Sequence, residues 1–287
     1  MMDTILISYR TEFKIDQLRD WTKQTTEDFQ GKKIKYYFNN EAARLTYYPL
    51  DRKLFVECSL PKIVFGNNYS MLESTDDTYK TLQKRIAIIT HDKIEIEYPG
   101  FASIHKIDGC YNFHTPDQVD SYLNYFSNLP LPYHGLPITF ADKTVTWPGK
   151  SQGLKFYDKY TESKQNPKAR NMLRMELRLQ HQKEFRKLLN KPKDEQILLN
   201  HITFDFIKDL LRDKLKEFFG TNEPIEKKDI DIFLDNFKPA KAAQLYGFIA
   251  SKQDGHNIYF PQKTLARYRK DLKSINYGCT LKPLQIK

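Results

Sequence analysis

Three carboxylates and one tyrosine stand in segments whose residues alternate as a β-strand requires. Side chains on a strand point alternately to its two faces, so each of these residues shares a face with further polar side chains. Carboxylate oxygens are the ligands that Mg²⁺ and Mn²⁺ prefer, and a tyrosine beside such a cation can attack a phosphodiester. The pattern therefore indicates a metal-dependent site for cutting DNA. The segments are 54–60 with Glu57, 103–113 with Asp108, 153–160 with Tyr157 and 172–180 with Glu176.

Tyr157 lies between Lys155 and Lys159, which alternation places on its own face of the strand. A phenol has a pKa of roughly 10 and is a weak nucleophile at neutral pH, so ammonium groups and a bound cation would favour its charged form. We predict that Tyr157 is the covalent nucleophile. We also predict that Lys159, with Lys155 or Arg178, steadies the phosphate. Tyr160 falls on the opposite face and is the second candidate nucleophile.

Each of these residues also has a simpler interpretation. An acid on the polar face of a strand is commonly solvated or ion-paired, and a tyrosine between lysines commonly lies on an edge strand. Lys106 with Asp108 could form such a cross-strand pair, and so could Arg174 with Glu176. The chain would then be a non-catalytic module that binds single-stranded nucleic acid on an open sheet. A transposase or relaxase with the same chemistry is a third alternative.

The chain is basic, with 46 Lys and Arg against 36 Asp and Glu in 287 residues, a net charge of +10. That charge favours a polyanionic partner, and nucleic acid is the first candidate. The 18 Tyr and 19 Phe provide rings that could stack on unpaired bases. The three cysteines are too few for a disulfide framework or a zinc knuckle, and no segment has the pattern of a signal peptide or a membrane span. We expect a soluble intracellular protein.

Predicted strands precede predicted helices along the chain. This order favours an α+β fold with a mostly antiparallel sheet, helices on one face and single-stranded DNA on the other, followed by a small all-helical C-terminal domain. We expect a catalytic nicking and joining domain at 1–190 and the helical domain at 196–287. The expected strands are 3–9, 33–38, 43–48, 54–60, 103–113, 139–147, 153–160 and 172–180. The expected helices are 14–29, 74–89, 115–129, 181–189, 201–219, 228–237, 240–252 and 261–275.

The last two expected helices are basic and could form a helix-turn-helix-like reader of duplex DNA. Their cations would contact phosphates, and each such contact weakens with added salt. A solvated helical cap on the catalytic domain would account for the same charge. The candidate DNA contacts here are Lys241, Lys263, Arg267, Arg269 and Lys270, and those near the carboxylates are Lys106, Lys155, Arg174 and Arg178.

At these same residues the chain resembles the gene II replication proteins of filamentous phages, which are rolling-circle initiators. The similarity follows the family's order over residues 50–180, although the spacing from Trp147 to Tyr157 is shorter than in the phage pattern. The Tyr-Asp-Lys stretch is also similar to staphylococcal rolling-circle plasmid initiators, so phage and plasmid origins are both open. The matching stretches include Phe-Val-Glu57-Cys-Ser-Leu-Pro-Lys, Lys106-Ile107-Asp108, Tyr157-Asp158-Lys159 and Met175-Glu176-Leu177-Arg178.

The resemblance implies a strand-specific nick at a replication origin. Tyr157 occupies the position of the family's attacking tyrosine, which forms a 5′-phosphotyrosine link, leaves a 3′-hydroxyl primer and later rejoins the strand. Mg²⁺ or Mn²⁺ would be the cofactor, held by carboxylates because no two histidines are two residues apart. The implied partners are single-stranded and duplex origin DNA with a host helicase and polymerase, in the cytoplasm of a bacterial host and without a membrane. The active form could be a monomer or a homodimer.

Overall fold

The structure is a computed structural model, which describes residues 2–28, 31–127, 137–141, 143–219, 235–253, 262–274, 284 and 286. The chain divides into two compact units, Met1–Phe218 with Leu284–Lys287 and Phe219–Pro283. The α+β prediction is confirmed, because a large antiparallel sheet with helices forms the first unit and the described elements of the second are helices.

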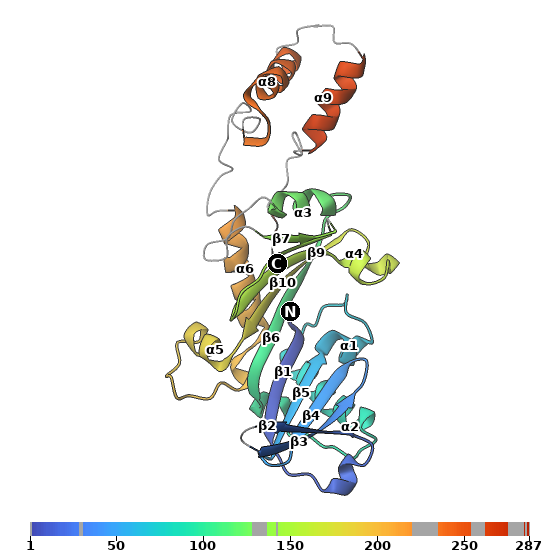
Figure 1. The fold of residues 1–287 in the computed structure, drawn as a ribbon, viewed down its shortest axis with the longest axis vertical. Coiled ribbons are helices and arrows are strands. Elements are labelled where there is room, and N and C mark those ends of the chain that lie inside the picture. Colours follow the sequence, from blue (N-terminus) through green and yellow to red (C-terminus); the bar gives the residue numbers. More distant parts are fainter. Residues whose placement is uncertain are drawn as a thin grey trace. The chain divides into compact units, whose positions relative to one another are not determined.

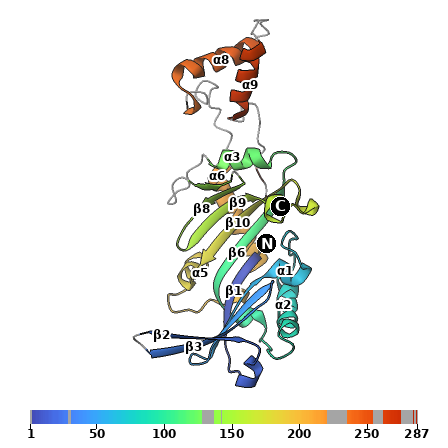
Figure 2. The ribbon, with the colours of Figure 1, turned by 45° about the vertical axis from the view of Figure 1, so that its right-hand side comes forward.

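The first unit is built on a ten-stranded sheet with the order β2-β3-β4-β5-β1-β6-β10-β9-β8-β7 (Figure 1). All of its paired strands are antiparallel. In Figure 2, β2 and β3 extend away from the other strands as a two-stranded arm. The strands are β1 (Met2–Arg10), β2 (Thr22–Asp28), β3 (Gly31–Asn39), β4 (Ala43–Tyr48), β5 (Lys53–Ser59), β6 (Ser103–His114), β7 (Ile138–Phe140), β8 (Thr144–Trp147), β9 (Gln152–Asp158) and β10 (Met172–Gln180).

Helices accompany the strands in the first unit and make up the described part of the second. Ser74 accepts a hydrogen bond from the backbone N–H of Asp77 and so caps α2, which corresponds to the expected helix at 74–89. No helix in the described part of the chain is long and apolar enough to cross a membrane. The helices are α1 (Leu60–Phe65), α2 (Thr75–Ile89), α3 (Val119–Ser127), α4 (Lys159–Glu162), α5 (Gln182–Leu188), α6 (Phe204–Phe219), α8 (Pro239–Gln253) and α9 (Gln262–Ser274), with 3-10 turns at Ile15–Leu18, Pro99–Phe101, Pro167–Ala169 and Leu199–His201.

The sheet buries one face, and helices pack against it. Leu177 of β10 pairs with Gly109 of β6 and Leu154 of β9, so these residues share that face. A Cβ on Gly109 would lie 2.6 Å from Ile207 Cγ2, which shows how closely α6 approaches the sheet. The opposite face carries the polar residues of the same strands, and we refer to it as the polar face. Its side chains include Glu57, Lys106, Asp108, Arg174, Glu176, Arg178, Lys155 and Tyr157.

The expected helix at 14–29 is wrong. A 3-10 turn at Ile15–Leu18 precedes strand β2, which begins at Thr22. Leu18 and Trp21 belong to the apolar spacing that suggested a helix, and both are buried here without forming one. The β-branched Thr22, Thr25 and Thr26 that follow favour a strand, and pairing with β3 provides their backbone hydrogen bonds.

Two expected strands have other bounds in the structure than the sequence suggests. The segment 139–147 is a hairpin of β7 and β8 that turns near Ala141, whose φ of 47° lies in the left-handed region. Strand β9 ends at Asp158 and not at residue 160. Asp158 Oδ1 accepts a 3.0 Å hydrogen bond from the N–H of Tyr160 and so caps α4.

Helix α6 belongs to the sheet unit, although the sequence suggested a domain boundary between residues 190 and 196. Ile207 and Leu211 of this helix are fully buried, because they cover the apolar face of the sheet. In the second unit, Ala242, Leu245, Phe248 and Tyr268 form a small core between α8 and α9. The expected helix at 228–237 lies mostly outside the described residues.

Replacing Gly109 with alanine should destabilise the first unit. The added methyl would meet Ile207 at 2.6 Å, and overpacking of this kind costs about 1–3 kcal/mol. Urea unfolding should show this loss. Gly153→Ala is the matched control, since its Cβ would meet nothing closer than 3.7 Å. Equal stability of the two variants would contradict close packing of α6 on the sheet.

Candidate functional site

The polar face brings together the acids that the sequence singles out. Strand β1 lies between β5 and β6, and its Leu6 pairs with both Glu57 and Lys106. Farther along β6, Asp108 pairs with Arg178 of β10. Paired residues of antiparallel strands point to the same face. Acids from β5, β6 and β10 therefore lie on one surface.

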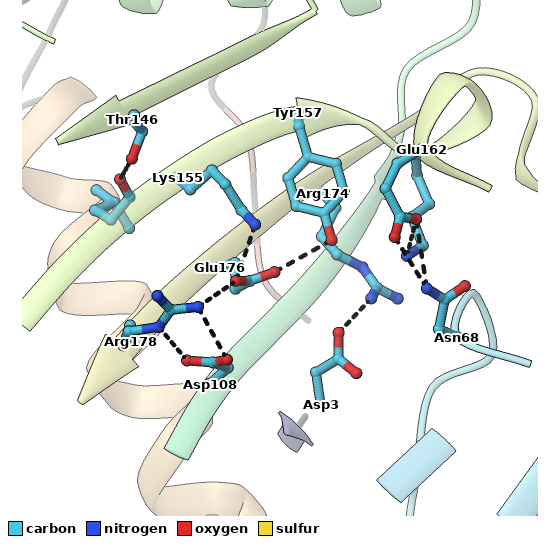
Figure 3. A network of polar contacts seen from close by, with 12 residues as sticks. Asp3, Asn68, Asp108, Thr146, Lys155, Tyr157, Glu162, Arg174, Glu176 and Arg178 are labelled. Atoms are coloured by element: carbon cyan, nitrogen blue, oxygen red, sulfur yellow. Dashed lines mark hydrogen bonds and ion pairs between the residues drawn. The ribbon is translucent and has the colours of Figure 1, made fainter. Parts of the chain in front are cut away.

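Lysine and arginine side chains stand between the acids. Lys106 Nζ lies 3.0 Å from Glu57 Oε1 and 3.7 Å from Asp108 Oδ2. Arg178 Nε donates to Asp108 Oδ1 at 2.8 Å (Figure 3). The ion pair of Lys106 with Asp108 that the sequence left open is therefore present, but it joins two residues of the same strand, β6, and does not cross between strands. We call Glu57, Asp108 and Glu176 the carboxylate row.

Glu176 extends the carboxylate row to strand β9. Its Oε1 lies 3.0 Å from Lys155 Nζ and 4.0 Å from Arg178 NH2. The hydroxyl of Tyr157 donates to the other oxygen, Oε2, at 3.2 Å. Figure 3 shows Glu176 between these groups. One carboxylate is therefore shared by two cations and the candidate nucleophile.

Two acids of the carboxylate row are largely removed from water. The side chains of Asp108 and Glu176 are 6% and 9% exposed, whereas that of Glu57 is 34% exposed. Burial raises the pKa of Asp108, the hydrogen bond from Arg178 opposes this rise, and the charge of Glu176 adds to it. Carboxylates this close remain ionised only beside positive charge. The row therefore requires cations.

Tyr157 is buried beneath its neighbours and only 5% exposed. Burial raises the pKa of its phenol well above the usual range, and the charge of Glu176 raises it further. Lys155 Nζ lies 4.4 Å from the centroid of the ring and Lys159 Nζ lies 5.5 Å from it. The phenol is therefore protonated, and its proton points at a carboxylate that can accept it.

Lys159 is fully buried at the start of α4. Its Nζ donates to Glu162 Oε2 at 2.6 Å, and the same carboxylate accepts from Asn68 Nδ2 at 3.1 Å. This lysine therefore supports the ring of Tyr157 from within the protein. Sequence reasoning does not find Glu162, although its i,i+3 spacing from Lys159 is the usual signal for such a pair.

Arg174 was expected to contact DNA, and its position contradicts this. The side chain is fully buried, with NH1 2.9 Å from Asp3 Oδ2. Its Nε donates to Asn112 Oδ1 at 2.6 Å, and its NH2 is buried without a hydrogen-bond partner among the described residues. Asp3 lies 171 residues away along the chain, so no local pattern could reveal this pair.

The other cations expected to contact DNA in the first unit are more accessible. The side chains of Lys106, Lys155 and Arg178 are 18%, 33% and 44% exposed. Each is bound to an acid of the carboxylate row on the polar face. These three residues can therefore reach a phosphate at the row.

In the second unit, helix α9 presents basic residues on one face. Lys263, Arg267 and Lys270 are exposed and follow i, i+4, i+7 spacing, whereas Tyr268 is buried against α8. Lys241 of α8 pairs with Asp271 and lies 5.6 Å from the ring centroid of Tyr268, and is thus partly engaged within the unit. The side chain of Arg269 lies outside the described part.

The donor atoms of the carboxylate row suit a hard divalent cation. Among the described residues, however, no group of three or more His, Cys, Asp or Glu side chains is arranged to hold a metal ion. Asp108 and Glu176 lie on adjacent strands, Arg178 lies within 4.0 Å of both carboxylates, and both carboxylates are largely buried. Their oxygens and their need for positive charge fit Mg²⁺ or Mn²⁺. Glu57 stands next to them and is joined to Asp108 through Lys106.

Comparisons with known proteins bear on the same segment. Residues 50–194, more than half of the chain, match the family model for the N-terminal region of the gene II replication-associated protein. The chain is also similar to the solved rolling circle replication initiator protein from Geobacillus stearothermophilus, with 11% identity and a TM-score of 0.41 over 79% of this chain and 89% of that one. No match was found among curated proteins.

The buried pair of Arg174 and Asp3 yields a prediction about stability. Arg174→Met should lower the free energy of unfolding by about 3–5 kcal/mol, because it leaves the buried Asp3 carboxylate without its cation. Chemical denaturation measures this change. Lys143→Ala breaks a more exposed ion pair with Asp120 and should cost less than about 1 kcal/mol.

The double variant Asp3→Leu with Arg174→Met separates charge from packing. It should be more stable than Arg174→Met alone, since no charge then remains buried. If the double variant loses as much free energy of unfolding as Asp3→Leu and Arg174→Met lose together, the pair does not act as a unit.

Proposed function

The chain belongs to the gene II-like family of rolling-circle replication initiators, and from this we propose that it nicks one DNA strand at a replication origin through Tyr157. The observation that carries the proposal is the hydrogen bond from the Tyr157 hydroxyl to Glu176 within the carboxylate row. Both residues lie inside the matched segment 50–194. The substrate is single-stranded DNA on the polar face of the sheet.

The proposed reaction is a transesterification. The phenolic oxygen of Tyr157 forms a bond to phosphorus while the bond from phosphorus to the 3′ oxygen breaks. The phenolic proton passes to Glu176 Oε2, 3.2 Å away, and the departing 3′ oxygen takes a proton from water. A 5′-phosphotyrosine link and a 3′-hydroxyl primer result. The reaction exchanges one phosphate ester for another, so it can run in reverse. Attack by a 3′-hydroxyl on the phosphotyrosine link then releases Tyr157 and rejoins the strand.

Positive charge near the phosphate offsets the charge that develops there. Lys155 and Arg178 can supply it, since both are partly exposed and adjoin Glu176. Lys155 also lies over the ring of Tyr157, so it must turn toward the phosphate for the phenol to react. Lys159 is fully buried and also lies near the ring, so it helps to hold the ring in place.

A divalent cation would complete this balance of charge. Asp108 and Glu176 would hold Mg²⁺ or Mn²⁺, with Glu57 as the next oxygen donor along the row. When bound, the cation would draw negative charge from the phosphate and so lower the barrier to attack by the Tyr157 oxygen on phosphorus.

A second candidate function is a non-catalytic module that binds single-stranded nucleic acid. The observations that favour it are the burial of Tyr157 and the ion pairs made by every acid of the carboxylate row. The two functions differ in whether a covalent link to DNA forms.

The second unit is proposed to bind duplex DNA at the origin through α9. Three exposed cations at helical spacing form a stripe on α9, and cations on an exposed helix face can contact phosphates along a groove. A host helicase and a host polymerase would act on the nicked product.

Tyr157→Phe should abolish the covalent adduct with a single-stranded origin oligonucleotide in the presence of Mn²⁺. The substitution removes only the attacking oxygen, so oligonucleotide binding should change less than about threefold, as expected for one exchanged hydrogen bond. Denaturing gel electrophoresis detects the adduct. Tyr160→Phe is the matched control and should leave adduct formation intact.

The same assay tests the cation. Chelation of divalent ions should stop adduct formation, and Asp108→Asn should slow it by about a hundredfold or more, because several kcal/mol of charge stabilisation are lost. An adduct that survives Tyr157→Phe but not Tyr160→Phe would reassign the nucleophile. A wild-type protein that binds the origin oligonucleotide but never forms an adduct would favour the binding module.

Substituting alanine at Lys263, Arg267 and Lys270 together should weaken binding to duplex origin DNA. The dependence of log affinity on log salt should also fall by about one unit for each lost phosphate contact. Fluorescence anisotropy at several salt concentrations measures both effects. A charge-matched triple variant in the first unit, Lys80→Ala with Lys168→Ala and Lys187→Ala, should leave the salt dependence unchanged. Equal effects of the two triple variants would contradict a role for α9.

A further inference from the structure

Three rings and a lysine form a cluster beside the carboxylate row. Phe55 stands two residues before Glu57 on β5 and shares its face. The centroid of its ring lies 5.8 Å from that of Tyr48 and 5.3 Å from that of His105. Lys53 Nζ lies 4.8 Å from the Phe55 centroid. We call these four side chains, Tyr48, Phe55, His105 and Lys53, the ring strip.

The register of the strands places the whole ring strip on the polar face. Tyr48 of β4 pairs with Lys53 of β5, so both point to the same side as Phe55. His105 reaches that side through a 2.8 Å hydrogen bond with Ser8, the residue that pairs with Phe55. The ring strip and the carboxylate row therefore adjoin along β5 and β6.

The rings of the strip are not part of the core. Leu54 and Val56, the neighbours of Phe55 on β5, are fully buried on the opposite face, whereas Phe55 itself is partly exposed. Tyr48 and His105 are partly exposed as well. The strand thus buries its aliphatic residues and leaves an aromatic ring at the surface, where burial alone would not place it.

The ring strip also carries positive charge. Lys53 lies over Phe55, and Arg10, which pairs with Lys53 across β1 and β5, is exposed on the same side. Burial and the charge of Lys53 lower the pKa of His105, so its imidazole is neutral at neutral pH. Rings that can stack on bases, next to cations that can contact phosphates, are the combination by which proteins hold unpaired nucleic acid.

We propose that the ring strip binds bases of the single-stranded DNA that flanks the phosphate to be cut. The position of that phosphate rests on the proposed function of the carboxylate row. Same-face positions on a strand are roughly 6.6 Å apart, comparable to the separation of successive nucleotides in an extended single strand. One strand of DNA can therefore contact the row and the strip together. Duplex DNA is a poorer occupant, because its base faces are already covered by neighbouring bases.

The strand could continue toward the arm formed by β2 and β3. Tyr37 of β3 pairs with Thr46 of β4, which in turn pairs with Phe55. Lys35 lies two residues before Tyr37 and shares its face. A ring and a cation thus follow the ring strip on the same side of the sheet.

The experiment compares oligo(dT) with an abasic oligonucleotide of equal length, which has the same phosphates but no bases. The full-length protein should bind oligo(dT) more tightly, as measured by fluorescence anisotropy in a chelating buffer that prevents cutting. Phe55→Ala and Tyr48→Ala should each weaken oligo(dT) binding about tenfold and leave binding of the abasic oligonucleotide unchanged. Phe55→Trp should retain the wild-type affinity, because it retains a stacking surface.

Phe101→Ala is the matched control, since Phe101 is 61% exposed and lies in a 3-10 turn outside the strands that carry the ring strip. It should not change either affinity. The proposal is overturned if Phe55→Ala keeps the wild-type preference for oligo(dT), or if it weakens both oligonucleotides equally, because the contact would then be to phosphates. Equal melting temperatures of the variants exclude unfolding as the cause.

This outcome is independent of the chemistry at Tyr157. If Phe55→Ala loses the preference for oligo(dT) but the wild-type protein never forms an adduct, the ring-strip proposal is supported and the nicking proposal is contradicted. If the adduct depends on Tyr157 but Phe55→Ala keeps the preference for oligo(dT), the nicking proposal is supported and the ring-strip proposal is contradicted.

Discussion

Compensation of buried negative charge is the constraint on which the polar face depends. Asp108 and Glu176 lie on adjacent strands, close enough for Arg178 to touch both, and little water reaches them. Such carboxylates are stable only with positive charge between them. Lys106, Arg178 and Lys155 provide it, and the ionic row therefore crosses from β5 to β9. Any phosphate or divalent cation that binds here must exchange partners with these side chains.

The same constraint separates the two roles of basic residues in the first unit. Arg174 and Lys159 are buried, paired with Asp3 and Glu162, and hold the strands and the ring of Tyr157 in position. Partly exposed cations of the carboxylate row can instead turn toward a phosphate. Burial, and not residue type, decides which basic residue supports the site from within and which one remains accessible at the surface.

The division of the sheet into an apolar and a polar face leaves one long polar surface, on which we propose that a single strand of DNA binds. Helices α3 and α6 use the apolar face, as the stacking of Phe126 on Phe156 and the approach of Ile207 to Gly109 show. The polar face then carries the carboxylate row and the ring strip side by side. Chemistry at the row and base contacts at the strip would act on neighbouring nucleotides of the same strand.

Alternation along the chain by itself determined the α+β class, most strand positions and the shared face of Glu57, Asp108, Glu176 and Tyr157, because a period of two is a local property of a strand. It could not determine that Arg174 is buried against Asp3, since that pair joins residues 171 positions apart. Helical spacing at 14–29 was misleading, because pairing with β3 outweighed it. Burial, partners and the exposure of Phe55 were decided only by the tertiary structure, which sets how far each charge and ring lies from water.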